Sequence, residues 1–165
     1  MFKKSALLGV SALACLHSVE PFTPESLLGT SVAQTVAVNP YTGESGAART
    51  GSVAATMNNI VVLNKLLETP NTPEASAEIR KVTAEINHLI PSLRVIGIFD
   101  FFPPLDWIGK GEQLGRVLAA ILYLKQFPDE ITPEISTALN KTFVETKSEY
   151  LKIELENLLP AVPKF

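Results

Sequence analysis

The sequence predicts an all-α protein, an up-down-up-down four-helix bundle that follows an extended N-terminal tail. The first observation is that apolar residues recur, in four separate stretches, at the spacing of one helical face. The second is that three of these stretches contain none of the 12 prolines, which lie mainly between them. The third is that no comparable stretch alternates with the period of two that marks a half-buried strand.

The four predicted helices occupy residues 48–160, and residues 161–165 form a short C-terminal tail. Short connections between helices of this length favour antiparallel neighbours, which is why a bundle is expected. Pro91 lies inside the second helix, which we expect to end near Ile90 or to kink and continue to Gly97. The apolar positions are, helix by helix, Val53, Met57, Ile60, Val61 and Leu67; Ala75, Ile79, Val82, Ile86, Leu89 and Leu93; Leu114, Val117, Leu118, Ile121 and Leu124; and Ile135, Leu139, Phe143, Tyr150 and Ile153.

The tripeptide Thr-Pro-Glu occurs three times, beginning at Thr23, Thr72 and Thr132. The threonine hydroxyl suits a helix N-cap, proline suits the first helical position, and the carboxylate is favoured by the helix dipole. Each copy therefore predicts a helix start. The first copy predicts one short helix, over residues 24–28 and closed by Gly29, within an otherwise irregular tail of residues 15–47.

The N-terminus has the pattern of an export signal. Lys3 and Lys4 precede a short apolar stretch, residues 5–14, that ends in Ala12-Leu13-Ala14. A basic start, a short apolar segment and small residues at the cleavage positions are typical of a secretory signal peptide. The apolar stretch is about ten residues long, and a membrane span needs about 20. We therefore predict a signal peptide at residues 1–14 and no transmembrane helix in the mature chain.

Cys15 follows this site directly, in the position of the lipid-attachment cysteine of bacterial lipoproteins, which the segment resembles. Leu13 departs from the lipoprotein pattern because it sits one place too close to the cysteine. Three alternatives stay open: a lipid anchor on Cys15, a plain cleaved signal with an incidental thiol, or cleavage further on, near residues 31–33. A single lipid would hold the protein at a membrane surface without spanning it.

Composition excludes several classes of function. The 165 residues carry 14 Lys and Arg against 17 Asp and Glu, a net charge of −3, and a nucleic-acid-binding protein would need a basic face. One cysteine excludes an internal disulfide framework and a multi-cysteine zinc site. Glu85 and His88 have the Glu-x-x-His spacing of di-iron bundles, but the only other histidine, His17, is in the tail. We predict no metal, no cofactor and no catalytic residues.

The unusual segment of the chain lies between the second and third predicted helices. Its four aromatic residues fall within nine positions, and Pro103-Pro104 stops any helix among them. One interpretation is that the rings fold back and close one end of the bundle. The other is an exposed contact surface, since aromatic side chains on a rigid loop are typical anchors for a partner. The interaction candidates are Phe99, Phe101, Phe102 and Trp107.

The layout as a whole resembles the PsbQ-like extrinsic subunits of photosystem II. The shared features are the export signal, the proline-bearing tail, four helices and a long last helix that contains Glu149-Tyr150-Leu151 and Leu158-Leu159-Pro160. The resemblance implies a lumenal, non-enzymatic bundle that stabilises a membrane complex, in some members through a lipid anchor. It implies no particular binding residue.

We expect a non-enzymatic, exported protein, in the periplasm or the thylakoid lumen, that docks on a protein complex at a membrane surface and stabilises it. The tail and the aromatic segment would make the contact. The alternative is a carrier that holds an apolar small molecule between its helices, and a cavity of about 300 Å³ or more would favour it.

Overall fold

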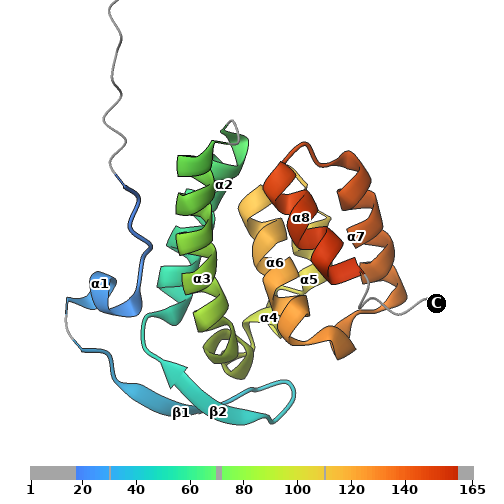
Figure 1. Ribbon diagram of the computed structural model, residues 1–165. Coiled ribbons are helices and arrows are strands. Elements are labelled where there is room, and N and C mark those ends of the chain that lie inside the picture. Colours follow the sequence, from blue (N-terminus) through green and yellow to red (C-terminus); the bar gives the residue numbers. More distant parts are fainter. Residues whose placement is uncertain (1–17, 30, 70–71, 110, 160–165) are drawn as a thin grey trace, which may run out of the picture.

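The computed structural model describes residues 18–29, 31–69, 72–109 and 111–159. The predicted signal peptide, Cys15, His17 and the C-terminal tail lie outside the described residues. The elements, in chain order, are α1 (Pro24–Leu28), β1 (Gln34–Val38), β2 (Ser45–Arg49), α2 (Ser52–Glu68), α3 (Pro73–Ile96), α4 (Ile98–Phe101), α5 (Pro104–Ile108), α6 (Leu114–Gln126), the 3-10 helix η1 (Pro128–Glu130), α7 (Pro133–Glu145) and α8 (Glu149–Leu158) (Figure 1).

The prediction of a mainly helical protein is confirmed, and so are the helix starts at the three Thr-Pro-Glu sequences. The hydroxyl oxygens of Thr23, Thr72 and Thr132 accept hydrogen bonds from the backbone N–H groups three residues on, at 3.0, 3.1 and 3.3 Å. The helix predicted at residues 24–28 is α1, and it ends at Gly29, whose φ of 68° is left-handed.

Helix α3 runs through Pro91 and continues to Ile96 before Gly97, with φ of 82°, ends it. Proline has no N–H, so it leaves the carbonyl of residue i−4 without its helical donor. Here that carbonyl belongs to Asn87, and Gln126 Nε2 on α6 donates to it at 2.8 Å. A side chain from a neighbouring helix therefore replaces the hydrogen bond that Pro91 removes, and the predicted continuation to Gly97 is confirmed.

The fourth predicted helix is two helices, so the four-helix bundle is not confirmed. Residues 146–148 separate α7 from α8, and the Ser148 hydroxyl accepts from Leu151 N–H at 3.4 Å to start α8. The chain turns there, and α8 packs on α6 while α7 packs on α5 and α8 (Figure 1). The absence of proline and glycine at residues 146–148 predicted one continuous helix, and this prediction is wrong.

The predicted tail contains a β-hairpin, which corrects the all-α fold class. Strands β1 and β2 pair antiparallel, with Val36 opposite Ala47 and Ala37 opposite Gly46. The inner face of the hairpin packs on α3, and a Cβ at Gly46 would lie 2.8 Å from a methyl carbon of Val95. Glycine leaves room there for the branched side chain of Val95, which lies directly against the backbone of β2. The hairpin has small residues inside, and the pattern expected of a half-buried strand is absent for that reason.

The chain before the hairpin is held against α2. The buried side chain of Asn59 accepts from Phe22 N–H and donates to Phe22 C=O, both at 2.8 Å. Next to it, Arg49 forms an ion pair with Glu25 at the start of α1. Residues 18–28 are therefore an ordered part of the fold, on the outer side of α2, whereas the sequence predicted an extended tail.

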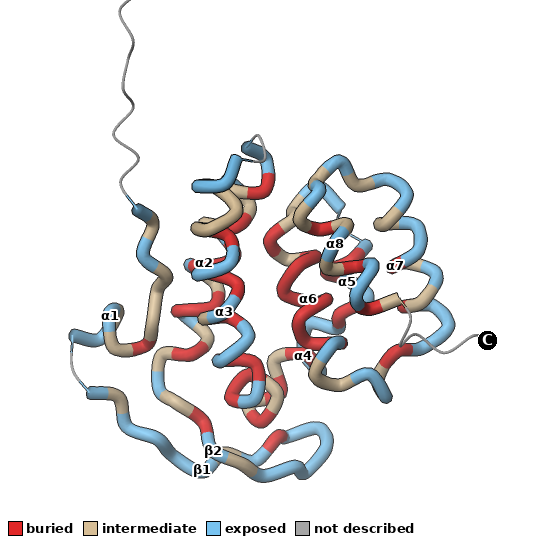
Figure 2. The backbone as a smooth tube through the Cα atoms, viewed as in Figure 1, coloured by how far each residue is buried: buried red, intermediate tan, exposed pale blue. Residues whose placement is uncertain are grey.

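Helix α6 is the centre of the core. It lies between the pair α2–α3 and α8 (Figure 1), and every residue from Val117 to Leu124 is buried (Figure 2). Gly115 at its start allows α2 close by, because a Cβ there would lie 2.4 Å from the carbonyl oxygen of Ile60. None of the helices in the described part combines the length and the apolar character that crossing a membrane requires.

Candidate functional site

The aromatic segment forms two short helices, α4 and α5, which turn the chain from α3 into α6. Gly97 ends α3 and begins α4, and its left-handed φ lets the chain change direction in one residue. Phe102 and Pro103 then separate α4 from α5, where Pro104 takes the first helical position. The sequence predicted that the two prolines exclude a helix among the rings, and this is wrong, because Pro103 separates two short helices and Pro104 begins the second. The rings fall on two different sides of the segment.

Two of the four predicted interaction residues belong to the core. Phe99 and Trp107 are each 4% exposed, and their ring centroids lie 5.6 Å apart. Phe99 also stacks on Tyr123 of α6, with centroids 3.8 Å apart, and Tyr123 in turn contacts Phe127 at 5.0 Å. These rings fix α4 and α5 on α6 and are closed to a partner.

A charged network covers the outer end of this ring cluster. Arg94 on α3 pairs with Glu44 in the hairpin turn at 2.8 Å and with Glu130 on η1, and its guanidinium lies 3.9 Å from the centre of the Phe127 ring. The hydroxyl of Tyr123 donates to Glu130. Burial and the bond to Glu130 raise the pKa of Tyr123.

The pKa of Arg94 is raised as well, although burial alone would lower it, because its bond to Glu44 and the charge of Glu130 outweigh burial. Buried Asn39 completes the junction by donating to the Arg94 carbonyl and to Asp100 Oδ2, both at 2.8 Å. This network joins the hairpin turn, α3, α4 and η1, and it holds the aromatic segment in place from the other side.

The other two predicted rings are on the surface. Phe101 is 64% and Phe102 44% exposed, and they meet edge to face with centroids 4.7 Å apart. Leu105, one turn further on, is 37% exposed, and Asp106 beside it is exposed as well. We call Phe101, Phe102, Leu105 and Asp106 the Phe101 surface. These exposed residues, three apolar and one acidic, lie on and between two short helices that are fixed on the core.

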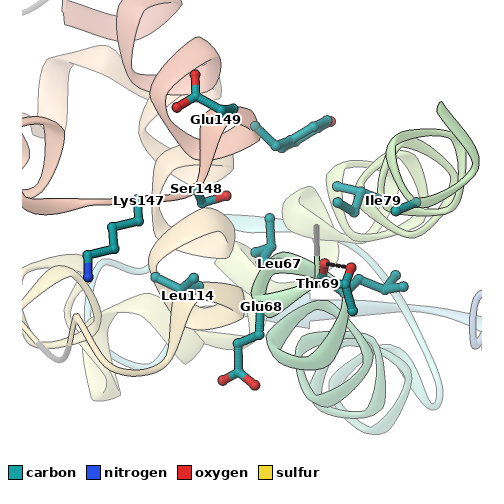
Figure 3. Close-up of a pocket in the computed structure, with 11 residues that line it drawn as sticks. Leu67, Glu68, Thr69, Ile79, Leu114, Lys147, Ser148 and Glu149 are labelled. Carbon is teal, nitrogen blue, oxygen red and sulfur yellow. Dashed lines mark hydrogen bonds between the residues drawn. The ribbon is translucent and has the colours of Figure 1, made fainter. Parts of the chain in front are cut away.

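A separate hollow of about 520 Å³, which no residue of the Phe101 surface lines, lies where four elements meet (Figure 3). It is formed by the end of α2, the start of α3, the start of α6 and the connection from α7 to α8. We call it the end pocket. Its apolar lining residues are Leu66, Leu67, Ala75, Ile79, Leu114 and Tyr150, and its polar ones are Glu68, Thr69, Lys147, Ser148 and Glu149.

The charged groups of the end pocket stand at its rim. In Figure 3 the ends of Glu68, Lys147 and Glu149 point away from the centre, which Leu67, Ile79 and Leu114 surround. Burial raises the pKa of Tyr150, whose ring forms part of the wall. A second hollow of about 310 Å³, between the end of α5 and α7, shares Leu114 with the end pocket. Both hollows are open to the surface, and both reach the volume of about 300 Å³ that would favour the carrier hypothesis.

Within the described ranges, no three His, Cys, Asp or Glu side chains are grouped in a way that would hold a metal ion. Glu85 is partly buried on α3, and burial raises its pKa; His88 is exposed. The candidate lipid-attachment residue, Cys15, lies outside the described residues. Sequence reasoning missed the end pocket because its lining comes from four separate segments, and it missed Leu105 because it searched for aromatic residues alone.

The fold and these two features define a small helical protein with a β-hairpin and two candidate binding surfaces. The chain belongs to the family described as Domain of unknown function (DUF7709), whose model matches residues 31–126. The match runs from the hairpin to the end of α6 and includes the Phe101 surface. The connection from α7 to α8 and the start of α8, which close one side of the end pocket, lie outside the match. Neither the curated proteins nor the solved structures contain a match to the chain.

Proposed function

We propose that this protein is a non-enzymatic binding protein that docks on a larger complex through the Phe101 surface. The observation that carries the proposal is the exposure of two adjacent phenylalanine rings on a segment that is otherwise anchored in the core. Exposed aromatic side chains held by a rigid support are the usual centre of a protein–protein contact, because little conformational entropy is lost when they bind.

The chemistry of the surface defines the partner. Phe101, Phe102 and Leu105 need an apolar depression, and the exposed carboxylate of Asp106 favours basic residues at its rim. Anionic lipid would repel this carboxylate, so a protein is a better partner than a bare membrane. Anionic lipid would also repel the chain as a whole, because its net charge is −3. Export and a place at a membrane surface, as in the PsbQ-like subunits, remain part of this proposal.

The double variant Phe101→Ser with Phe102→Ser tests the proposal. Membranes from cells that produce the protein are solubilised, and the proteins that co-purify with the wild-type and variant chains are quantified by mass spectrometry. We expect the main partner to fall by about tenfold or more, since losing two central anchors costs more than about 2 kcal/mol. Because Asp106 faces a basic rim, recovery of the wild-type complex also falls as salt is raised.

Val144→Ser is the matched control, because Val144 is 80% exposed on α7, away from this surface. Circular dichroism and the thermal midpoint of the double variant should match those of the wild type, since neither ring is buried. Recovery of the partner that is equal for the wild type, the control and the double variant would remove the Phe101 surface from the proposal.

Mass spectrometry of the mature N-terminus tests the predicted export. A chain that begins at Cys15 with an added acyl mass supports the lipid anchor, and one that begins there without it supports a plain signal peptide. A chain that still begins at Met1 is incompatible with cleavage after Ala14.

A second candidate function rests on the end pocket. Its volume of about 520 Å³ is within the range of small-molecule sites, and its apolar centre with charged groups at the rim suits a ligand with one apolar chain and a polar head. Ala75→Trp would fill the pocket, and Ala54→Trp, on the exposed face of α2, is the control. Binding of a fluorescent fatty acid that Ala75→Trp abolishes and Ala54→Trp preserves would support this function, and equal binding by both variants would exclude it.

A further inference from the structure

Among the residues that the structure describes, no strand pairs with the outer edge of β1 in the β-hairpin. Asn39 N–H donates to Glu44 C=O, and Thr50 N–H donates to Ala33 C=O. In an antiparallel ladder, every second residue of a strand directs its backbone N–H and C=O groups at the partner strand. Since Ala33 and Asn39 do so, the backbone groups of Thr35 and Ala37 also point at β2. The N–H and C=O groups of Gln34, Val36 and Val38 therefore point to the opposite side of β1, where the two-stranded sheet ends.

Nothing on β1 protects this edge. Edge strands of natural proteins usually carry a charged residue, a proline or a bulge that prevents pairing with another chain. The stretch from Ser31 to Val38 has no charge and no proline, and Val36 is 82% and Val38 61% exposed. The outer edge of β2, by contrast, carries Arg49. The hairpin lies at the margin of the molecule, with most of its surface exposed (Figures 1 and 2).

We propose that β1 pairs with β1 of a second copy, antiparallel and about a two-fold axis through Val36, to form a continuous four-stranded sheet. In this register Val36 faces the second copy's Val36, and Gln34 faces its Val38. The edge groups of these three residues then donate to and accept from the same three residues of the second chain, so the pairing is self-complementary.

The side chains favour a second copy over an unrelated strand. No charged group opposes another across the axis, and the exposed valines gain apolar cross-strand neighbours that water cannot give them. The contact involves one short strand from each chain, so it is small, and we expect a weak, concentration-dependent dimer. It leaves the Phe101 surface free, since the hairpin and α4–α5 present different residues.

Val36→Pro tests the hydrogen bonds. Proline removes the Val36 N–H, which points to the free edge, and leaves the N–H groups that face β2 in place. Sedimentation velocity of the purified chain, under reducing conditions because of Cys15, should show a dimer that increases with concentration for the wild type. We expect Val36→Pro to be a monomer at the same concentrations, and Val61→Thr, an exposed valine on α2, to match the wild type.

A charge exchange keeps the test valid if proline distorts the hairpin. Val36→Lys and Val36→Glu place like charges opposite each other at the axis, so each variant alone should be a monomer. An equimolar mixture of the two should form a heterodimer, because position 36 then faces an opposite charge. A wild-type chain that is monomeric up to the solubility limit, or a dimer that these variants leave unchanged, would overturn the proposal.

Discussion

At the scale of single residues, Gly115 determines how closely α2 and α6 approach. Its N–H donates to Asn64 Oδ1 at 2.7 Å, and a Cβ at this position would lie 2.4 Å from the Ile60 carbonyl oxygen and 2.9 Å from Asn64 Oδ1. Real Cβ atoms do not come so near to backbone oxygens, so any side chain must push the two helices apart. The φ angle of Gly115 is not left-handed, so the close packing of the two helices, and not the backbone conformation, requires glycine here.

The substitution Gly115→Ala should destabilise the protein by about 2 kcal/mol, in the range of overpacking a filled core. In an exposed helix the same change would stabilise it slightly. Urea unfolding followed by circular dichroism measures the difference. Gly111→Ala is the control, since nothing lies within 4 Å of a Cβ there. Equal stability of the two variants would show that α6 moves away from α2 at no cost.

At the scale of elements, local sequence signals predicted helix starts well and interruptions poorly. The Thr-Pro-Glu caps are local, because they depend on a threonine hydroxyl, the proline after it and a backbone N–H three residues on. All three predicted caps are present in the structure. At the break over Thr146–Ser148 the cap is Ser148 followed by Glu149, without a proline, and this weaker signal did not lead to the prediction of a helix start. The hairpin escaped prediction because its inward positions, Ala37, Gly46 and Ala48, are small while Val36 and Val38 point to water.

The continuation of α3 through Pro91 also depends on a residue far away in the sequence. We expect Gln126→Ala to destabilise the wild-type protein by about 1 kcal/mol, since it leaves the Asn87 carbonyl without a donor. In the background of Pro91→Ala the backbone N–H of residue 91 can donate instead, and Gln126→Ala should then cost clearly less. A double-mutant cycle of unfolding free energies measures this coupling. Purely additive effects would show that Gln126 does not replace the missing hydrogen bond.

At the scale of the whole molecule, the candidate sites could be predicted only in part. The sequence indicated the aromatic segment, but which rings face inward depends on the contact of Phe99 with Tyr123, a residue of another helix. The end pocket exists only because the ends of α2, α3, α6 and α8 meet, and no local pattern encodes such a meeting. Composition limits the class of protein, whereas tertiary contacts decide which surfaces are open.

The stability of the whole molecule should depend on the protonation of Glu85. Burial raises the pKa of this carboxyl, against the smaller opposing effects of His88 and Arg49, and its Oε1 is buried without a hydrogen-bond partner. The folded chain therefore keeps the proton to a higher pH than the unfolded chain, in which the pKa of a glutamate side chain is about 4.3. The stability that the bound proton contributes is complete below the unfolded pKa and is lost as the pH rises through the folded pKa.

Glu85→Gln should accordingly raise the thermal midpoint at pH 7, and the gain should shrink as the pH falls towards 4. Differential scanning calorimetry at several pH values checks this, with Glu112→Gln as an exposed control. A midpoint at pH 7 that is unchanged or lowered by Glu85→Gln would mean that the ionised carboxyl is stabilised in the folded protein.

The side-chain amide of Asn59 binds the backbone N–H and C=O of Phe22. These two hydrogen bonds involve only the main chain, so they do not depend on which side chain stands at position 22, except that proline would remove the N–H. The anchor must stay an amide of that length, because aspartate cannot donate and glutamine would reach too far. As far as these hydrogen bonds are concerned, variation between relatives should be tolerated at position 22 and forbidden at position 59.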